Sequence, residues 1–353
     1  MTDWLSANDE SDAQEQLHTL RCTDGLPVIV PTAERVERLV LASGLDADLA
    51  LGTMGPGGGV ATIEQVAVVA VMAGCLPDYM PVVVAAVKAV IDPRFDLTEM
   101  QATTHCTAPL IIVNGPARDS CGGISSGFGA LGPGHRANAT IGRALRLAMI
   151  NIGGGRPGES DMALLGHPGK FTYCLAEDEE SSPIPPLHTA LGFAESDSVV
   201  TVIGAEAPHS LIYSPTGEPC ADARRLTLVI AACLANIGSN NAILRGGAAV
   251  VVLNPEHAGL YHKAKMGRTE IQQALFESAA KPSAELRAVG GSYAPDATAD
   301  EMINAFTGPE DILVLVAGGA GLYTMVMPTW CAGPHVNRAV SIRVEMDQVC
   351  ELR

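Results

Sequence analysis

The chain has 353 residues, of which 47% are hydrophobic and 17% are charged, and its formal net charge is −17. This amount of apolar material is enough for a large buried core, and the length favours two domains or two fused halves. An acidic chain lacks the basic face that nucleic-acid binding requires, so nucleic acid is not expected as a partner.

The first 24 residues are polar and acidic, and we expect them to form a mobile tail. A secretory signal would begin with basic residues followed by an apolar core. No apolar run reaches the roughly 18 residues that a membrane-spanning helix requires. These features predict a cytoplasmic protein without membrane contact.

Nine cysteines are scattered along the chain, and no two of them have the CxxC spacing. In a cytoplasmic protein such cysteines are expected to be free thiols rather than a disulfide framework. Their spacing relative to the histidines matches no structural zinc motif.

Helix caps predict three helices in the first hundred residues. Thr32 and Gly44 are typical of the start and end of the first helix. Thr62 and Gln65 form a capping-box pattern that starts a buried helix ending at residue 73. A second buried helix is predicted over residues 79–90.

Cys75 lies at the junction between these two buried helices. A position near a helix N-terminus lowers the pKa of a thiol and activates it as a nucleophile. The alternative is that Cys75 is a small buried residue in a tight corner.

Residues 113–149 are the part of the chain around which the rest is organised. An apolar run over 109–113 predicts a strand, and a loop with eight glycines between Gly115 and Gly142 separates it from a helix predicted over 137–150. A glycine-rich loop before a helix exposes backbone N–H groups that bind anions. We expect the anion to be bound by Gly132, Gly134, Arg136, Asn138 and Arg143.

His105 and Cys106 precede this strand and are candidate metal ligands. Adjacent residues of a strand point to opposite faces, so they do not readily bind one metal ion. A structural role for His105 is the alternative.

Four consecutive carboxylates, residues 177–180, follow a short strand predicted over 171–176. Such a block is usually a solvated turn. Here it follows two loops that contain Arg156 and Lys170, and Lys170 is a further candidate for substrate binding. We therefore expect Glu177 or Glu179 to act as a general base or a metal ligand.

The remaining chain alternates apolar strands with helices. Strands are predicted over 198–204, 248–253, 311–317 and 339–344, and helices over 225–237, from 257 and from 269. Uninterrupted apolar strands that alternate with helices indicate an α/β fold with mostly parallel sheets flanked by helices.

The order of buried helix, strand, and Asn with Pro at 64–116 recurs at 225–255. This repetition predicts two similar α/β halves. We expect an acidic tail over 1–24, a first half over 25–190 and a second half over 191–353, with the site between the halves.

Ligands of such sheets bind at the carboxyl ends of strands. The polar or glycine residues that follow predicted strands are Asn114, His209, His257 and Gly319. The Gly318–Gly321 sequence lacks the GxGxxG and GxxxxGK[ST] patterns, so no nucleotide cofactor is expected.

Five segments resemble a bacterial group of UGSC-type (seleno)proteins, which are distantly similar to the selenoprotein subunits of glycine reductase. The segments are 67–87, 113–116, 129–147, 167–183 and 254–259. The resemblance implies an α/β enzyme fold. The group's name implies a Sec- or Cys-Gly-Ser-Cys redox motif, whereas the nearest sequence here, Ser120-Cys121-Gly122-Gly123, lacks the second cysteine.

Together these patterns predict an enzyme that acts on a small carboxylate-like anion by lyase or hydrolase chemistry. Cys75 or Cys121 is the expected nucleophile, and Glu177 or His257 the acid/base group. One alternative is a metal-dependent enzyme, with a divalent ion bound by His, Cys and Glu side chains. Another is a thiol redox protein or a non-catalytic ligand-binding subunit, and the apolar surplus favours a homo-oligomer.

Overall fold

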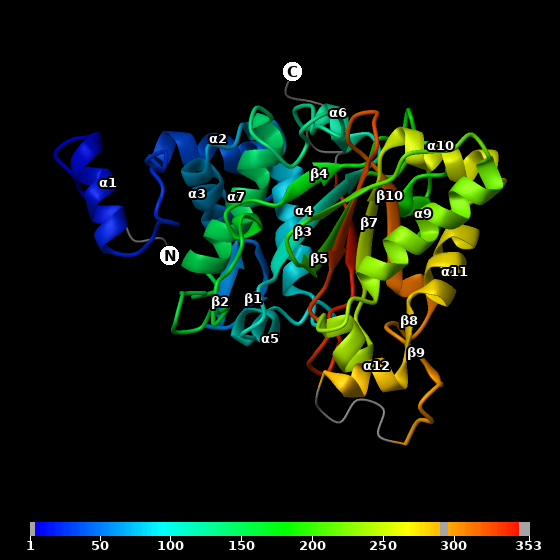
Figure 1. The fold of residues 1–353 in the computed structure, drawn as a ribbon. Coiled ribbons are helices and arrows are strands. Elements are labelled where there is room, and N and C mark those ends of the chain that lie inside the picture. The colour runs from blue at the N-terminus through cyan, green and yellow to red at the C-terminus, as the bar shows by residue number, and fades with distance from the viewer. Residues whose placement is uncertain (1–3, 290–295, 346–353) are drawn as a thin grey trace.

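The computed structural model describes residues 4–289 and 296–345. Two four-stranded sheets pack face to face, and helices cover the outer face of each (Figure 1). The predicted α/β class is confirmed. Within the described ranges, no helix combines the length and hydropathy needed to cross a membrane.

The first sheet has the strand order β12-β5-β3-β4. Its strands are β3 (Ala108–Asn114), β4 (Cys174–Ala176), β5 (Val199–Ala205) and β12 (Val340–Arg343). The pair β3–β4 is parallel, whereas β3–β5 and β5–β12 are antiparallel.

The second sheet has the order β10-β7-β11-β6. Its strands are β6 (His209–Ile212), β7 (Ala249–Leu253), β10 (Ile312–Val316) and β11 (Tyr323–Pro328). The pair β7–β10 is parallel, and β7–β11 and β11–β6 are antiparallel. Both sheets therefore repeat one pairing pattern, and parallel pairing is limited to one pair in each.

Most helices begin and end close to the predicted positions. The first sheet is covered by α4 (Met80–Ile91) and α7 (Arg136–Asn151), and α2 (Ala33–Ser43) and α3 (Ile63–Ala73) pack on these two helices. The second is covered by α9 (Pro219–Leu234), α10 (Pro255–Lys263) and α11 (Arg268–Ser278). Thr32 and Thr62 accept the capping hydrogen bonds that their sequence positions predict.

The described chain also contains further α-helices and two small hairpins. The helices are α1 (Glu10–Thr19), α5 (Leu97–Ala102), α6 (Ala117–Ser120), α8 (Leu187–Ala190) and α12 (Ser283–Ala288). Two small hairpins pair β1 (Ala50–Met54) with β2 (Gly59–Thr62) and β8 (Ala280–Pro282) with β9 (Met302–Asn304). The N-terminal segment, predicted as a mobile tail, therefore contains a helix.

Alternating side chains explain why the strands are apolar along their whole length. In β3, Leu110 and Ile112 pack between the two sheets, whereas Ile111 and Val113 pack against the helices. A strand that is buried on both faces needs apolar residues at every position.

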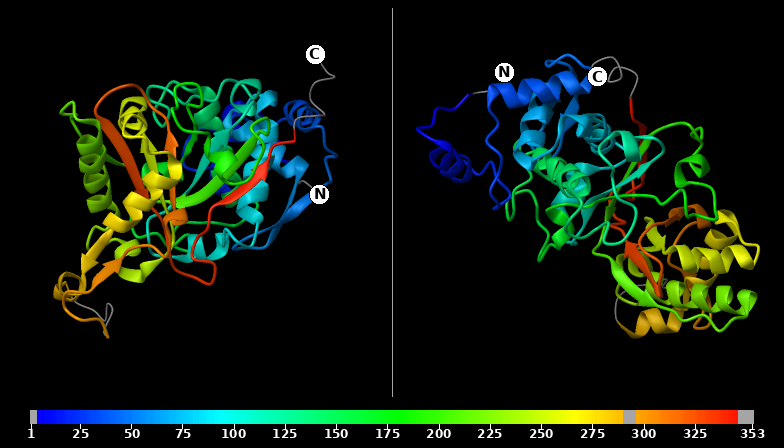
Figure 2. Two further views of the ribbon diagram at one scale, coloured as in Figure 1. Left: turned by 90° about the vertical axis from the view of Figure 1, so that its right-hand side faces the viewer. Right: turned by 90° about the horizontal axis from the view of Figure 1, so that it is seen from above.

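The predicted boundary at residue 190 does not separate the two sheets. Both β5 and β12 lie beyond it and belong to the first sheet, while all four strands of the second sheet lie within residues 209–328. The second half is thus inserted between β5 and β12, because strand pairing over long sequence distances decides sheet membership. Figure 2 shows the two halves as adjacent lobes.

Candidate functional site

The carboxyl ends of β3, β4 and β10 meet between the two sheets. The backbone N–H of Glu177, just after β4, donates to the Val113 carbonyl at 3.1 Å. The next N–H, of Asp178, donates to the Val316 carbonyl of β10 at 2.7 Å. The carboxylate block therefore begins where both halves contribute the ends of their strands, which is the usual position of a ligand site in α/β sheets.

Glu177 is fully buried at this position and contacts both halves. Its Oε2 accepts hydrogen bonds from Asn114 Nδ2 at 2.6 Å and from Leu187 N at 2.7 Å. Its Oε1 lies 3.3 Å from Nη2 of Arg268, the first residue of α11. Burial raises the pKa of Glu177, while the Arg268 charge and these hydrogen bonds oppose the rise.

Asn114 links Glu177 to Glu179. Its Nδ2 also donates to Glu179 Oε1 at 2.9 Å, and Gly115 N donates to the same oxygen at 2.7 Å. Both amide hydrogens of Asn114 thus bind carboxylates. The opposite amide orientation would place its oxygen against two carboxylates, so the hydrogen-bond network fixes the orientation described here.

Arg118 connects Glu179 to the surface. Its Nη2 lies 3.2 Å from Glu179 Oε2, and its two terminal nitrogens bind the Glu180 carboxylate at 2.7 and 2.8 Å. The Glu180 side chain is 68% exposed. Glu179 and Arg118 line an open cleft of about 470 Å³, whose rim includes Glu180 and Glu195.

His188, in α8, lies against the buried side of Glu179. The side chain is fully buried, and its Nδ1 is 3.9 Å from Glu179 Oε1. Its Nε2 lies 3.4 Å from the Glu195 carbonyl, so we assign the ring proton to Nε2, which leaves Nδ1 as an acceptor. His188 has no sequence signal of a site residue, because only its contact with Glu179 distinguishes it.

We call the group formed by Glu177, Glu179 and the residues whose side chains contact them, Asn114, Arg118, His188 and Arg268, the cluster around Glu177. Unsatisfied polar atoms concentrate in this cluster. Within the described ranges, seven buried side-chain nitrogen or oxygen atoms have no hydrogen-bond partner. Four of the seven are Asn114 Oδ1, His188 Nδ1, and Nε and Nη1 of Arg268. Each unsatisfied buried group costs about 1–3 kcal/mol, so a cluster of them requires an explanation such as a catalytic role or a bound ligand.

The two candidate nucleophiles lie elsewhere, in the core between the first sheet and its helices. Cys75 is 7% exposed and its thiol donates to the Thr140 carbonyl at 3.3 Å, while Cys121 is 1% exposed. Burial raises the pKa of both thiols to about 12. Because the thiolate is the nucleophilic form, these surroundings do not favour a nucleophilic role.

The arginines expected to bind an anion are bonded to the protein. Arg136 donates to the Gly74 carbonyl at 3.0 and 3.3 Å. Arg143 forms a bidentate pair with Asp24, with both distances 2.8 Å, so it ties the N-terminal segment to α7.

The glycine-rich loop is also bonded internally. Gly132 N donates to Gly129 O at 2.7 Å, and Gly134 has a φ of 106°. Asn138 bonds both backbone polar groups of Ser125, so it anchors the loop. The predicted anion site is therefore not assembled from these residues.

Gly319, in the loop after β10, packs against the glycine-rich loop. A Cβ atom at this glycine would lie 2.0 Å from the Phe128 ring. The ring occupies the space in which we expected a ligand.

The two histidines predicted after strands do not join the cluster. His257 is fully buried, with Nδ1 2.7 Å from Thr324 Oγ1 and Nε2 3.1 Å from the Tyr213 carbonyl. Burial lowers its pKa, which favours the neutral ring, and both ring nitrogens are already bonded within the protein. His209 is exposed and pairs with Val326 in β6–β11.

The candidate metal ligands are also separated. His105 bonds Glu206 and Asn240, both at 2.9 Å, and Cys106 Sγ accepts a hydrogen bond from Gly166 N. Glu179 belongs to the cluster around Glu177. In the part of the chain that the structure describes, no three or more His, Cys, Asp and Glu side chains are grouped as a metal site.

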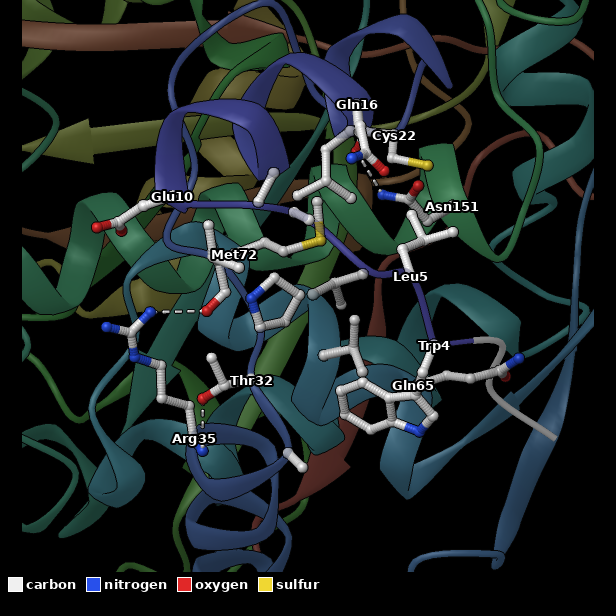
Figure 3. Close-up of a pocket in the computed structure, with 18 of the residues that line it drawn as sticks. Trp4, Leu5, Glu10, Gln16, Cys22, Thr32, Arg35, Gln65, Met72 and Asn151 are labelled. Atoms are coloured by element: carbon white, nitrogen blue, oxygen red, sulfur yellow. Dashed lines mark hydrogen bonds between the residues drawn. The ribbon is translucent and has the colours of Figure 1, made fainter.

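Two further cavities lie away from Glu177. The larger, about 830 Å³, lies between the N-terminal segment and α2 and α3, and Trp4, Leu5 and Met72 contribute apolar walls (Figure 3). The other, about 430 Å³, contains Lys170, whose Nζ bonds Asp161 at 2.6 Å. Neither is lined by the cluster around Glu177.

Comparison of the chain with protein-family models, curated proteins and solved structures gives no match. The resemblance to the UGSC-type group therefore stays an expectation.

Proposed function

We propose that this protein is an enzyme that acts on a small carboxylate-like substrate by acid/base chemistry of the lyase or hydrolase type. The site is the cleft at Glu179, close to the buried contact of Glu177 with Arg268 of the second half. One observation supports this proposal above the others: unsatisfied buried polar atoms gather around two linked carboxyl groups, one of which lines an open cleft.

Glu179 is the general base in this proposal, because it reaches both the cleft and the buried cluster. The 3.9 Å between its Oε1 and His188 Nδ1 exceeds a hydrogen-bond distance, so proton transfer requires a closer approach of the two side chains on substrate binding or one bridging water molecule. His188 then accepts the proton that Glu179 removes. Asn114 and Glu177 act as positioning residues. Asn114 donates a hydrogen bond to Glu179 from its buried side, and Glu177 accepts the other hydrogen bond of the same amide nitrogen.

Arg118 binds the substrate carboxylate. Its guanidinium already holds an exposed carboxylate, that of Glu180, in a bidentate geometry. A substrate carboxylate that replaced Glu180 would gain the same two charge-assisted hydrogen bonds.

Two reaction types fit one base at this position. In a lyase reaction, Glu179 removes a proton from the carbon next to the carboxylate, and the C–H electron pair forms a double bond as a leaving group departs from the adjacent carbon. In a hydrolase reaction, Glu179 removes a proton from water, which attacks a carbonyl carbon, and the leaving group takes up the proton.

The test is turnover or C–H exchange in D2O, followed by proton NMR, with a panel of small hydroxy acids, amino acids, amides and lactones. The wild-type chain should convert, or exchange deuterium into, at least one class. Glu179→Gln should abolish this signal, and His188→Asn should reduce it by roughly 10²–10⁴-fold.

Glu34→Gln, on the exposed face of α2, is the matched control and should retain the wild-type rate. A Glu179→Gln protein that folds normally and keeps the rate would remove Glu179 as the base. A panel without any turnover or exchange would contradict the proposed substrate class.

A further inference from the structure

The cavity of about 430 Å³ contains an excess of positive charge, although the chain as a whole is strongly acidic. It lies between the N-terminal segment, α7 and the loops around residues 156 and 166. Four of its lining residues are Arg or Lys and two are Asp. These six are Arg21, Arg146, Arg156, Lys170, Asp24 and Asp161.

Two of these charges are neutralised by residues outside the lining. Asp24 pairs with Arg143 at 2.8 Å, and Arg21 pairs with Glu159 at 2.7 Å. Neither pair contributes net charge to the cavity.

The remaining lining charges are three cations and one carboxylate. Asp161 is shared by Arg146, at 3.2 Å, and Lys170, at 2.6 Å. The Arg156 guanidinium has no hydrogen bond or ion pair to residues 4–289 or 296–345. The cavity therefore has an uncompensated charge of two positive units, three cations minus one carboxylate.

The inner wall of the cavity is buried. Arg146 is 8% exposed and Asp161 is 6% exposed. Burial lowers the pKa of Lys170, and the nearby Arg146 charge lowers it further. Placing two cations beside a single carboxylate away from water is unfavourable, so a bound anion would relieve the cost.

We propose that this cavity binds a small doubly charged oxyanion, such as a phosphate group. Arg156 provides the unpaired guanidinium, and Arg146 and Lys170 form the buried wall. Two negative charges match the two uncompensated positive charges, whereas a singly charged ion leaves one of them unmatched. This site is separate from the Glu179 cleft and does not depend on the proposed reaction.

Sulfate is the probe, because it is a dianion at neutral pH. Its binding is measured by calorimetry at low ionic strength and by the rise in Tm, with acetate at equal ionic strength as the singly charged comparison. Sulfate should bind saturably at one site per chain and raise the Tm, because it binds only the folded state. Acetate should give little effect.

Arg156→Gln and Lys170→Gln should each weaken sulfate binding by at least tenfold. Arg38→Gln, an equal charge change on the exposed face of α2, should leave it unchanged. Glu179→Gln should also leave it unchanged, which separates this inference from the proposed reaction. Absence of saturable sulfate binding, equal effects of acetate and sulfate, or unaltered affinity in both cavity variants would each overturn the proposal.

Discussion

Asn114 holds two carboxyl groups together with a single amide, so its replacement by a third carboxyl group should be costly. We expect Asn114→Asp to lower the free energy of unfolding by about 3–5 kcal/mol at pH 7.5, as for other unpaired buried charges. The loss should shrink towards pH 5, because crowded buried carboxylates take up protons more readily.

Urea unfolding at the two pH values measures this difference. Asn236→Asp is the control, because Asn236 is exposed and its change should stay within about 0.5 kcal/mol. Equal losses in both variants would show that the amide bridge is unimportant for stability.

Glu177 should give the protein a pH-dependent loss of stability. Its pKa is raised above 4.5 by burial, so the folded state holds this proton more tightly than the unfolded state does. The corresponding stabilisation is fully present below the unfolded pKa and is lost as the pH rises through the folded pKa.

Glu177→Gln should remove the pH-dependent stabilisation that comes from the Glu177 proton. It should also leave Arg268 without its counter-charge at every pH. The unfolding free energy of the variant minus that of the wild type should therefore increase as the pH is raised from 4.5 to 8. A difference that stays constant would mean that the carboxyl group ionises in the folded state as it does in the unfolded state.

The buried cysteines should be unreactive in the folded protein. With a pKa of about 12, about one Cys75 or Cys121 thiol in ten thousand is a thiolate at pH 8. Iodoacetamide labelling followed by peptide mass spectrometry should modify the exposed Cys220 first. Labelling of Cys75 or Cys121 as fast as Cys220 would restore the predicted nucleophilic role.

At the scale of single elements, two helical glycines should respond in opposite directions to alanine. Gly142 lies in α7, and a Cβ there would approach Thr172 Oγ1 to 2.4 Å and Tyr173 N to 2.5 Å. Gly259 lies in α10, where a Cβ would meet nothing within 4 Å.

Gly142→Ala should destabilise the protein by about 1–3 kcal/mol through overpacking, despite the better helix propensity of alanine. Gly259→Ala should stabilise it by roughly 0.4–1 kcal/mol. Thermal unfolding of both variants tests the pair. Stabilisation by both would mean that α7 has room to move away from β4.

The elements themselves were largely predictable, because their signals are local. Apolar runs and N-caps located β3, β7, β10 and the start of α2 and α3. By contrast, β6 and β11 were missed, since β6 is mostly exposed and β11 alternates between exposed and buried residues over its first four positions. Neither has the continuous apolar run that located the other strands.

The site was only partly predictable, because some of its residues have local sequence signals and others are brought together only by folding. Asn114 and Glu177 follow predicted strands, so their position could be inferred from strand ends. Arg268 lies 91 residues from Glu177 in the sequence, and only folding brings the two into contact. The anion prediction likewise missed the partners of Arg136 and Arg143, because neither the Gly74 carbonyl nor Asp24 has a sequence signal that relates it to an arginine more than 60 residues away.

At the scale of the whole molecule, the first predicted half should not fold alone. A fragment that ends at residue 190 contains β3 and β4 but lacks β5 and β12, the other two strands of its sheet. We expect fragment 1–190 to lack dispersed amide signals in NMR spectra and to gain them when fragment 191–353 is added. Independent folding of fragment 1–190 would show that its helices and two strands form a sufficient core.

The insertion of the second half has a consequence for how the chain can be rearranged. The chain leaves the first sheet at Ala205 and returns at Thr329, and these two residues face each other in an antiparallel bridge. Two facing antiparallel residues can be joined by a two-residue turn. The intervening 123 residues, 206–328, are therefore a cassette that could be removed or exchanged at a single junction, provided that the inner face of the first sheet received a new apolar cover.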